Sequence, residues 1–353
     1  MSAEPLNSRE ALKYLGIPKK NFENYYKFSG EIKSIKKNGS YFFEKVELDR
    51  WAALRESRTV YLTMAEYEKC FELAIQMAYS KGSSSGTGIR GVRSEMQQAD
   101  DWILGILAEF GLKKFLKKYT GKSVVLDSEP HPEEGITAQD LVGFDGREPR
   151  IGVAVKSSKE KSCFNVIPPI EYENDNRKSD VYVFARVMLP SDHLFRILGD
   201  HSFFKTVREK INKKVAEQEV KIAALQVELG KIELSVEKMR EKSKMVTKTV
   251  RDRAEAASQR DEIKNKINER RKEIENLKKK ISNTNAYKKM DSLPEKIPIW
   301  ICGYNDHEDL EKVSEIPGQK FEGKNGEEGR RYVKSVSGMK NSDDDWKNFV
   351  DRL

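Results

Sequence analysis

A long charged stretch between Phe203 and Ile281 limits most strongly how this chain can fold. In its first half, apolar residues follow the alternating spacing of four and three that defines a coiled-coil seam. They are Ile211, Val215, Ile222, Leu225, Leu229, Ile232, Val236 and Met239. The spacing resumes in a shifted register at Ile263, Ile267, Ile274, Leu277 and Ile281. Because the register changes, the stretch is not one continuous heptad ladder.

Strongly β-forming segments flank this stretch, with Asp180–Val187 before it and Ile297–Tyr304 after it. If both strands belong to one sheet, the helical stretch must leave the sheet and return to nearly the same place. Two antiparallel helices do this, with a bend between Ser243 and Ser258. We therefore expect a coiled-coil hairpin over residues 205–291. A charge-rich coil is usually solvated, so dimerisation or spacing is favoured over a direct grip on DNA.

The N-terminal segment predicts a small helical module with a basic hairpin. Asn7 and Glu10 form a capping-box pattern that opens a helix, and a second helix is expected over Lys19–Tyr26. Residues 30–43 then predict two strands joined by a basic turn of the primed type. Another helix is expected to begin at Val46.

The next segment predicts two helices separated by a break. Thr63 and Glu66 form a second capping box, opening a helix to about Ser80. A Gly/Ser run over residues 81–88 marks a domain boundary. From Ser94 to Tyr119 the apolar pattern is that of a long amphipathic helix.

Short strands follow this long helix. We expect strands at Ser123–Leu126, Ile136–Phe144 and Ile151–Val155, the last two joined as a hairpin at Asp145-Gly146. An edge strand over Arg331–Val336 and a closing helix from Asp343 to Leu353 complete the chain. A helix followed by several strands predicts an α/β core with a mixed sheet.

The expected hairpin brings Asp140 and Lys156 side by side at one end of the sheet. A carboxylate there can hold Mg²⁺, and an ammonium group can orient a water or stabilise charge on a phosphate. From these two residues alone, the simpler interpretation is an ordinary surface aspartate and an ordinary lysine at the end of a strand. The four histidines and three cysteines lack metal-ligand spacing, and no phosphate-binding loop predicts a nucleotide cofactor.

Composition bounds the class of protein. The 353 residues suffice for two or three domains, and the formal charge of +8 with 35% charged residues favours a polyanionic partner. No long apolar run or signal peptide is visible, so we expect a cytoplasmic protein with no membrane partner.

The segments "SREALKYLGIPKKNFENYY", "KKNGSYFF" and "ELDRW" resemble excisionase/MerR-like winged helix-turn-helix modules over about the first 51 residues. The resemblance implies that the second helix enters the major groove of DNA and that the basic turn reaches phosphate or the minor groove. The implied DNA contacts are Lys19, Lys20, Asn21 and Asn24 on the helix, and Lys36, Lys37 and Asn38 at the turn.

Further along, "LAEFGLKKFL", "QDLVGF", "IGVAVKSSK", "SDVYVFARV" and "IWICGY" resemble, in order and spacing, the core of PD-(D/E)xK nucleases. More narrowly, they are similar to type II restriction endonucleases, over residues 89–204 and 292–353. The resemblance implies a restriction-endonuclease-like mixed-sheet core. The chain is then divided into a winged helix over residues 1–55 and a connecting helix with a linker over residues 56–88. The nuclease core covers residues 89–204 and 292–353, and the inserted hairpin covers residues 205–291.

The same resemblance implies roles for individual residues. Asp140 matches the metal-binding aspartate, Lys156 the catalytic lysine, and Glu109 the glutamate contributed by a helix, with Glu95 as its fallback. The carbonyl of Val155 is expected to complete the shell of a Mg²⁺ or Mn²⁺ ion. Ser157 and Ser158 are within reach of phosphate, although ordinary strand-end hydrogen bonding is the simpler role.

One position departs from the pattern. The second acid should stand two residues before the lysine, where this chain has Ala154. Either Glu109 substitutes for it, or a later acid such as Glu160 or Glu171 takes the place, or the site is inactive.

These features together predict a Mg²⁺-dependent, site-specific double-stranded DNA endonuclease that acts as a homodimer, since cutting both strands needs two active sites. One alternative is a non-restriction nuclease for repair or defence. The other is a non-catalytic DNA-binding or scaffold protein.

Overall fold

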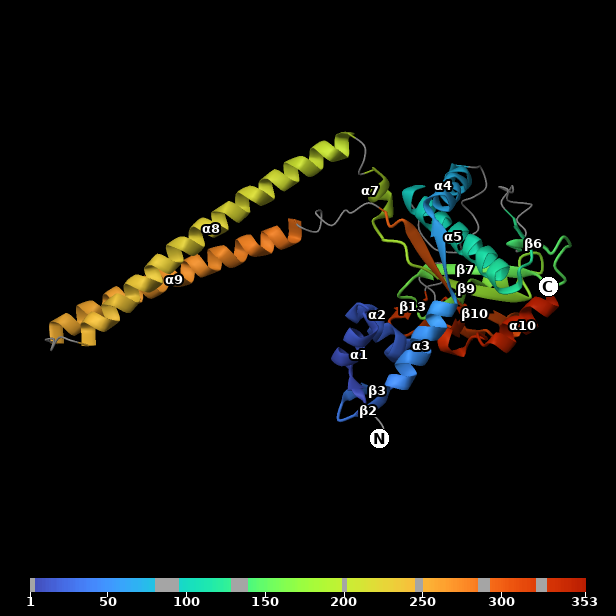
Figure 1. Cartoon of the computed structure of the whole chain (residues 1–353), viewed down its shortest axis with the longest axis horizontal. Helices are drawn as coiled ribbons and strands as arrows, with labels where there is room; N and C mark the ends of the chain where they lie inside the picture. The colour runs from blue at the N-terminus through green and yellow to red at the C-terminus, as the bar shows by residue number, and fades with distance from the viewer. Residues whose placement is uncertain are drawn as a thin grey trace. The chain divides into compact units, whose positions relative to one another are not determined.

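The computed structural model describes residues 4–79, 95–127, 139–198, 202–244, 250–284, 293–321 and 329–353. The chain divides into two compact units, one formed by Met1–Leu189 with Pro294–Leu353 and the other by Pro190–Leu293. The first unit is a mixed α/β structure (Figure 1). The predicted Gly/Ser linker, residues 81–88, lies outside the described residues.

A four-stranded sheet of order β4-β10-β9-β7 forms the centre of the first unit. β7 and β9 run parallel, and the other neighbours are antiparallel. The strands are β4 (Thr59–Thr63), β7 (Val153–Lys159), β9 (Val181–Val187) and β10 (Lys296–Asp306). The pairing of β9 with β10 confirms the expected neighbours of the insertion. β4 was not predicted, because its residues were assigned to a connecting segment.

Two helices cover one face of this sheet, α4 (Met64–Tyr79) and α5 (Glu95–Thr120) (Figure 1). The backbone N–H and side chain of Thr63 both donate to Glu66, which confirms the second capping box. α5 approaches β10 closely at Gly111, where an added Cβ would lie 2.5 Å from Cγ2 of Ile299. A larger residue at this position requires Ile299 or α5 to shift.

The N-terminal elements cover the opposite face. They are β1 (Leu6–Asn7), α1 (Ser8–Leu15), α2 (Lys19–Glu23), the π-helix η1 (Asn24–Phe28), β2 (Ile35–Lys37), β3 (Ser40–Phe43) and α3 (Lys45–Ser57). The capping box of Asn7 with Glu10 is confirmed. The turn between β2 and β3 has positive φ at Asn38 (49°) and Gly39 (79°), as a primed turn requires.

These N-terminal elements do not form a separate domain. Buried aromatic side chains of the segment share one cluster with Phe184 and Trp300 of the central sheet. Arg186 of β9 is fully buried and forms a bidentate ion pair with Glu31, at 2.6 and 2.8 Å. Such a pair is costly to break, because one charge would remain buried without its partner. The predicted boundary near residue 55 is therefore not a boundary between compact units.

The predicted hairpin around Asp145-Gly146 is wrong as a strand pair. β6 (Leu141–Phe144) pairs in antiparallel fashion with β5 (Val124–Leu126), whereas β7 pairs with β9. The turn at Asp145 instead folds back on β6 through the bridge between Phe144 and Arg147. Residues 128–138, which include the start of the predicted strand, lie outside the described residues.

The remaining elements of the first unit are short strands and helices. A second sheet has the order β11-β14-β8, and β12 pairs with β13. These elements are β8 (Phe164–Ile167), α6 (Pro169–Tyr172), the 3₁₀-helix η4 (His307–Asp309), β11 (Glu311–Val313), β12 (Glu315–Ile316), β13 (Gln319–Lys320), β14 (Arg331–Ser335), the 3₁₀-helix η6 (Val336–Gly338) and α10 (Asp343–Arg352).

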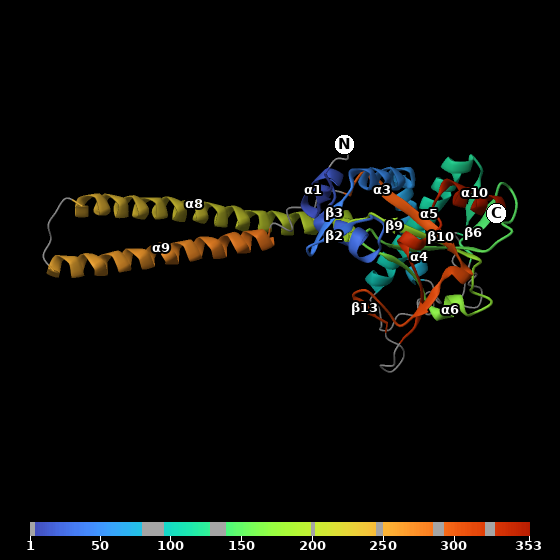
Figure 2. The ribbon, with the colours of Figure 1, turned by 90° about the horizontal axis from the view of Figure 1, so that it is seen from below.

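The second unit contains α7 (His193–Leu198), α8 (Ser202–Lys244) and α9 (Val250–Thr284). Figure 2 shows α8 and α9 lying side by side as a hairpin. Residues from the predicted seam are buried between them, among them Val215, Ile222 and Ile274. Arg271 also binds Glu233 across the pair at 2.7 Å. α8 ends at Lys244 and α9 begins at Val250, both within the bend predicted between Ser243 and Ser258. Residues 245–249 lie outside the described part.

Within the described residues, no helix combines the length and the apolar character needed to cross a bilayer.

Candidate active site

Asp140 lies beside the outer edge of β7, just before β6. Its backbone N–H donates to the carbonyl of Val153 at 2.9 Å, and its own carbonyl accepts from the N–H of Asp127 at 3.0 Å. Its side-chain Oδ2 accepts from the N–H of Val155 at 2.6 Å. Backbone and side chain together hold this carboxylate against β7, although no regular β6–β7 ladder forms.

Lys156 follows Val155 on β7 and forms an ion pair with Glu171 of α6. About a quarter of each side chain is exposed, 25% and 24%. Burial lowers the pKa of Lys156, but the carboxylates of Glu171 and Asp140 outweigh it, and the net shift of this pKa is upward. The lysine is therefore a charged ammonium group at neutral pH.

Glu109 reaches the same region from α5 and is half-buried. Burial raises the pKa of Glu109 well above its usual value, and the nearby carboxylate of Asp140 raises it further. The ammonium group of Lys156 opposes this shift. The three predicted residues Glu109, Asp140 and Lys156 are thus close enough to influence one another's protonation.

Burial also raises the pKa of Asp140, to about 6. The Lys156 ammonium and the hydrogen bond from Val155 act in the opposite direction but do not cancel it. Burial is the main cause of both upward shifts, and a cation bound between the two carboxyl groups would stabilise their ionised forms.

Val155 contributes backbone groups to this edge of β7. In an extended strand, the N–H and C=O of one residue point to the same side. Because the N–H of Val155 binds Asp140, its carbonyl also faces the edge where Asp140 lies. Ser157 and Ser158 lie further along β7, half-buried and paired in register with β9.

Ala154 lies on the same face of β7 as Lys156, since side chains alternate along a strand. It is buried with Ile167, Tyr182 and Leu310, and so leaves no acid at the position of the motif. Glu171 approaches this face from α6 and contacts Lys156.

Glu160, the other acid considered for this place, lies elsewhere. Its carboxylate accepts hydrogen bonds from Asn21 at 2.8 Å and from Arg55 at 2.7 Å. It joins the end of β7 to the N-terminal elements and makes no described contact with Lys156. The structure therefore separates the two candidates: Glu171 lies at the site and Glu160 does not.

Stacked rings support the short helix that carries Glu171. Tyr172 lies between His307, with ring centroids 3.8 Å apart, and Tyr332, at 3.5 Å. The hydroxyl of Tyr182 donates to the carbonyl of Glu171 at 3.3 Å. These contacts hold α6 in place although it is only one turn long.

Two further predictions concern metal ligands. Glu95 begins α5, but its side chain lies outside the described residues. In the described part of the chain, no three His, Cys, Asp or Glu side chains gather as a ready metal cluster. The oxygen donors that fit a hard cation are the carboxylates of Glu109 and Asp140 and the carbonyl of Val155.

The predicted DNA-contacting residues fall into two groups. Asn21 and Asn24 face the end of β7, where Asn21 binds Glu160 and Asn24 donates to the carbonyl of Lys161 at 2.9 Å. Each contact uses one N–H of the side-chain amide, and entry of these two residues into a DNA groove stays a prediction.

The basic residues remain accessible. Lys19 on α2 and Lys36, Lys37 and Asn38 at the β2–β3 turn are exposed, whereas the side chain of Lys20 lies outside the described part. The exposed side chains are free to meet a phosphate backbone.

Sequence reasoning missed Asp127, which follows β5 directly. Its N–H binds Asp140, and its carboxylate raises the pKa values of Glu109 and Asp140. The only signal in the sequence was an acidic residue at the end of a short strand, which is common on protein surfaces.

No protein-family model matches the chain, and neither a curated protein nor a solved structure is significantly similar to it. Function is therefore argued from the geometry of the site.

Proposed function

We propose that the chain is a Mg²⁺-dependent, site-specific double-stranded DNA endonuclease of the type II restriction class, with Mn²⁺ as an alternative ion. The observation that carries this proposal is the grouping of Glu109, Asp140 and Lys156 at one edge of β7. The order of α5, β5, β6, β7 and the parallel β9 adds support, because it agrees with the PD-(D/E)xK nuclease resemblance.

Glu109, Asp140 and the carbonyl of Val155 are the groups that would hold the ion. A bound Mg²⁺ supplies a site that lowers the pKa of a water and neutralises charge on a phosphate. The raised pKa values of both acids fit this role, because ionised carboxylates at this place are stabilised by a cation.

Lys156 would contact the water and the phosphate, and Glu171 would position Lys156. The ammonium group of Lys156 donates hydrogen bonds to the attacking water or to the non-bridging phosphate oxygen, where negative charge builds. Glu171 holds the ammonium group in place through their ion pair. Glu109 would be the second acid among the groups that hold the ion, and Glu171 would position Lys156.

The exposed lysines of the N-terminal elements would add affinity for the DNA backbone. Because these elements share a core with the sheet, this surface is fixed relative to the nuclease site rather than tethered by a linker. Phosphate contacts of this kind position a protein on DNA without reading its sequence.

The test is incubation of plasmid DNA with the protein and Mg²⁺, followed by sequencing of the ends. Discrete fragments with one end sequence support restriction. A smear of random ends supports a repair or defence nuclease with the same chemistry. Absence of cleavage with both Mg²⁺ and Mn²⁺ overturns the proposal.

A second candidate, a non-catalytic DNA-binding or scaffold protein, is favoured by one observation. Ala154 is packed in an apolar cluster, and Lys156 is already paired with Glu171, so the site is partly neutralised without an ion. Calorimetric titration with Mn²⁺ separates the two: binding that is lost in Asp140→Asn supports the nuclease, and absence of binding supports the scaffold.

A further inference from the structure

α8 carries a second apolar stripe in addition to the seam that it buries against α9. Its residues follow one another at spacings of four and three, as in a coiled-coil seam. They are Ala216, Val220, Ala223, Val227, Gly230 and Leu234, and all are exposed. Val220, Val227 and Leu234 are 71%, 60% and 57% exposed. We call this set the outer stripe.

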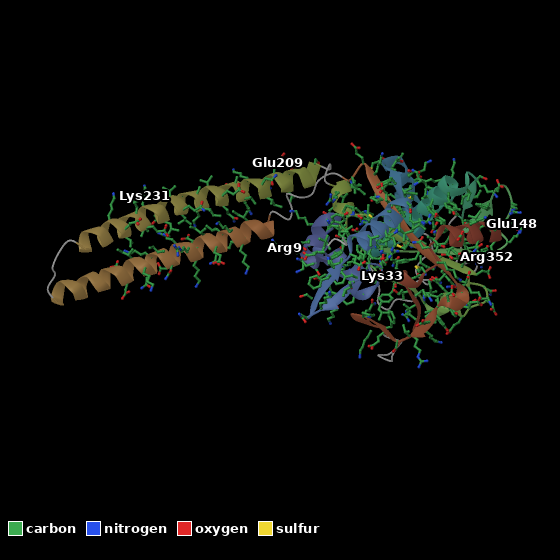
Figure 3. The ribbon with its side chains drawn as sticks, turned by 60° about the horizontal axis from the view of Figure 1, so that its bottom comes forward. Arg9, Lys33, Glu148, Glu209, Lys231 and Arg352 are labelled. Carbon is green, nitrogen blue, oxygen red and sulfur yellow. The ribbon has the colours of Figure 1, made fainter. Side chains whose placement is uncertain are left out.

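The outer stripe lies on the side of α8 that faces away from α9. At about 100° per residue, its centre is roughly 130° around the helix from the seam formed by Val215, Ile222 and Leu225. Figure 3 shows Lys231, which neighbours the stripe, pointing away from α9. On α9, every exposed residue from 261 to 280 is polar or charged, so this part of α9 carries no such stripe.

Gly230 is an independent sign of a partner. Glycine in the middle of a helix is unfavourable relative to alanine. Packing within the described part of the hairpin does not require it, because no described atom lies within 4 Å of an added Cβ at this position. A helix from another molecule that approaches closely here accounts for it.

We propose that the outer stripe binds the outer stripe of a second copy of this chain, with the two α8 helices antiparallel. In that register Val220 lies opposite the partner's Gly230, Val227 opposite the partner's Ala223, and Leu234 opposite the partner's Ala216. Each large side chain then meets a small one, which permits close packing. A parallel pair sets large residues against large and small against small, and leaves voids.

Charges at the ends of the stripe favour the same orientation. The outer stripe is continued at the same spacing by Lys213, three residues before Ala216, and by Glu237, three residues after Leu234. Both residues are exposed. Antiparallel packing places Lys213 opposite the partner's Glu237, whereas parallel packing places each charge against its own copy. On one flank, Glu217 also approaches the partner's Lys231.

The other flank brings Glu219 toward the partner's Glu233. Glu233 is already paired with Arg271 of α9 at 2.7 Å, which reduces the repulsion. The stripe spans about 27 Å of helix, enough for three pairs of large and small residues in each direction. The argument for this dimer uses only residues of α8 and does not rest on the nuclease function proposed above.

Solution mass of the full chain, measured by sedimentation, tests the proposal. The wild type is expected at twice the 40.6 kDa of one chain, and Val227→Glu at the mass of one chain. The matched control is Val207→Glu, an exposed valine of α8 outside the stripe, which is expected to remain dimeric. A monomeric wild type, or a dimer that survives Val227→Glu, overturns the proposal.

Gly230→Leu distinguishes loss of the dimer from loss of folding. The substitution improves helix propensity, so the helical circular dichroism signal is retained or raised while the mass falls to one chain. A dimer that persists in Gly230→Leu overturns the antiparallel packing of small against large residues.

Disulfide formation tests the orientation. The three native cysteines are buried, so the wild type is the background control. A mixture of Val220→Cys and Gly230→Cys chains is expected to form the mixed disulfide, and neither variant alone is expected to cross-link. Cross-linking of Val220→Cys with itself indicates a parallel pair and contradicts the proposal.

Discussion

At the scale of single residues, the site depends on acids that no local pattern distinguishes. Asp140 and Lys156 were identified from the sequence because strand and motif spacing agree around them. Glu160 and Glu171 were equivalent in the sequence, since both follow Lys156 closely. The structure separates them through partners distant in the chain: Asn21 and Arg55 hold Glu160, whereas the stacked ring of Tyr172 holds Glu171 at Lys156. Such long-range contacts are not encoded in a local pattern.

The first prediction concerns these two acids. Glu171→Gln is expected to lower the rate of Mg²⁺-dependent DNA cleavage by about 100-fold, because Lys156 loses its positioning charge and the site loses a carboxylate. Glu160→Gln is the matched control and is expected to cleave within about threefold of the wild type. Single-turnover cleavage measures both. Equal rates in the two variants would remove Glu171 from the site.

A second prediction uses the pH dependence of stability. The folded-state pKa of Asp140 is raised to about 6 and that of Glu109 is also raised, so the folded state binds more protons than the unfolded state. Stability contributed by these protonated acids is present at low pH and is lost as the pH rises through about 6. Bound Mg²⁺ should therefore raise the melting temperature more at about pH 8 than at about pH 5.

Asp140→Asn serves as the control for that measurement. The variant keeps a side chain of the same size but removes the ionisable group, so the Mg²⁺-dependent increase at high pH should be largely lost. Thermal unfolding followed by circular dichroism gives both values. An equal Mg²⁺ effect in wild type and Asp140→Asn would indicate binding elsewhere on the chain.

At the scale of elements, most helices and strands follow from capping and periodicity, but their pairing does not. Both capping boxes are found where the sequence indicates them. β4 was missed although Thr59–Thr63 is rich in β-formers, because a strand far from its partner in sequence gives no local sign of pairing. The hairpin around Asp145-Gly146 failed for a related reason: turn residues predict a reversal, and the partner strands are chosen by the rest of the sheet.

The third prediction concerns α5, which carries Glu109. Gly111→Ala places a methyl group against Ile299 and is expected to lower the free energy of unfolding by about 1–3 kcal/mol, because the Ile299 side chain or α5 must shift to make room. Gly105→Ala, on the same helix with open space around it, is the matched control and should gain roughly 0.5–1 kcal/mol. Urea unfolding compares them. Stabilisation by both substitutions would mean that α5 does not pack closely at Gly111.

At the scale of the whole molecule, the insertion was predicted more accurately than the N-terminal boundary. A heptad pattern between two strands requires a hairpin, and the second unit spans Pro190–Leu293. The N-terminal residues were expected to form a separate domain, because they resemble a winged helix-turn-helix module. Only the structure shows that Tyr25 and Trp51 pack on Trp300 of the sheet.

The fourth prediction removes the insertion. Val187 pairs with Ile299, and the N–H of Met188 donates to Pro298 at 3.0 Å, so a short glycine-rich turn is able to join β9 to β10. The variant lacking residues 190–293 is expected to fold, to sediment as one chain and to nick plasmid rather than linearise it. A folded variant that still linearises plasmid at the wild-type rate would exclude the hairpin from double-strand cleavage.

The central claim is that Asp140, Glu109 and Lys156 form one phosphodiesterase site at the edge of β7. The most direct measurement is the Mg²⁺-dependent cleavage of supercoiled plasmid by wild type, Asp140→Asn and Lys156→Ala, with circular dichroism to confirm folding. Cleavage by the wild type and a loss of at least about 100-fold in each folded variant is the predicted result. Undiminished cleavage in either folded variant would contradict the account.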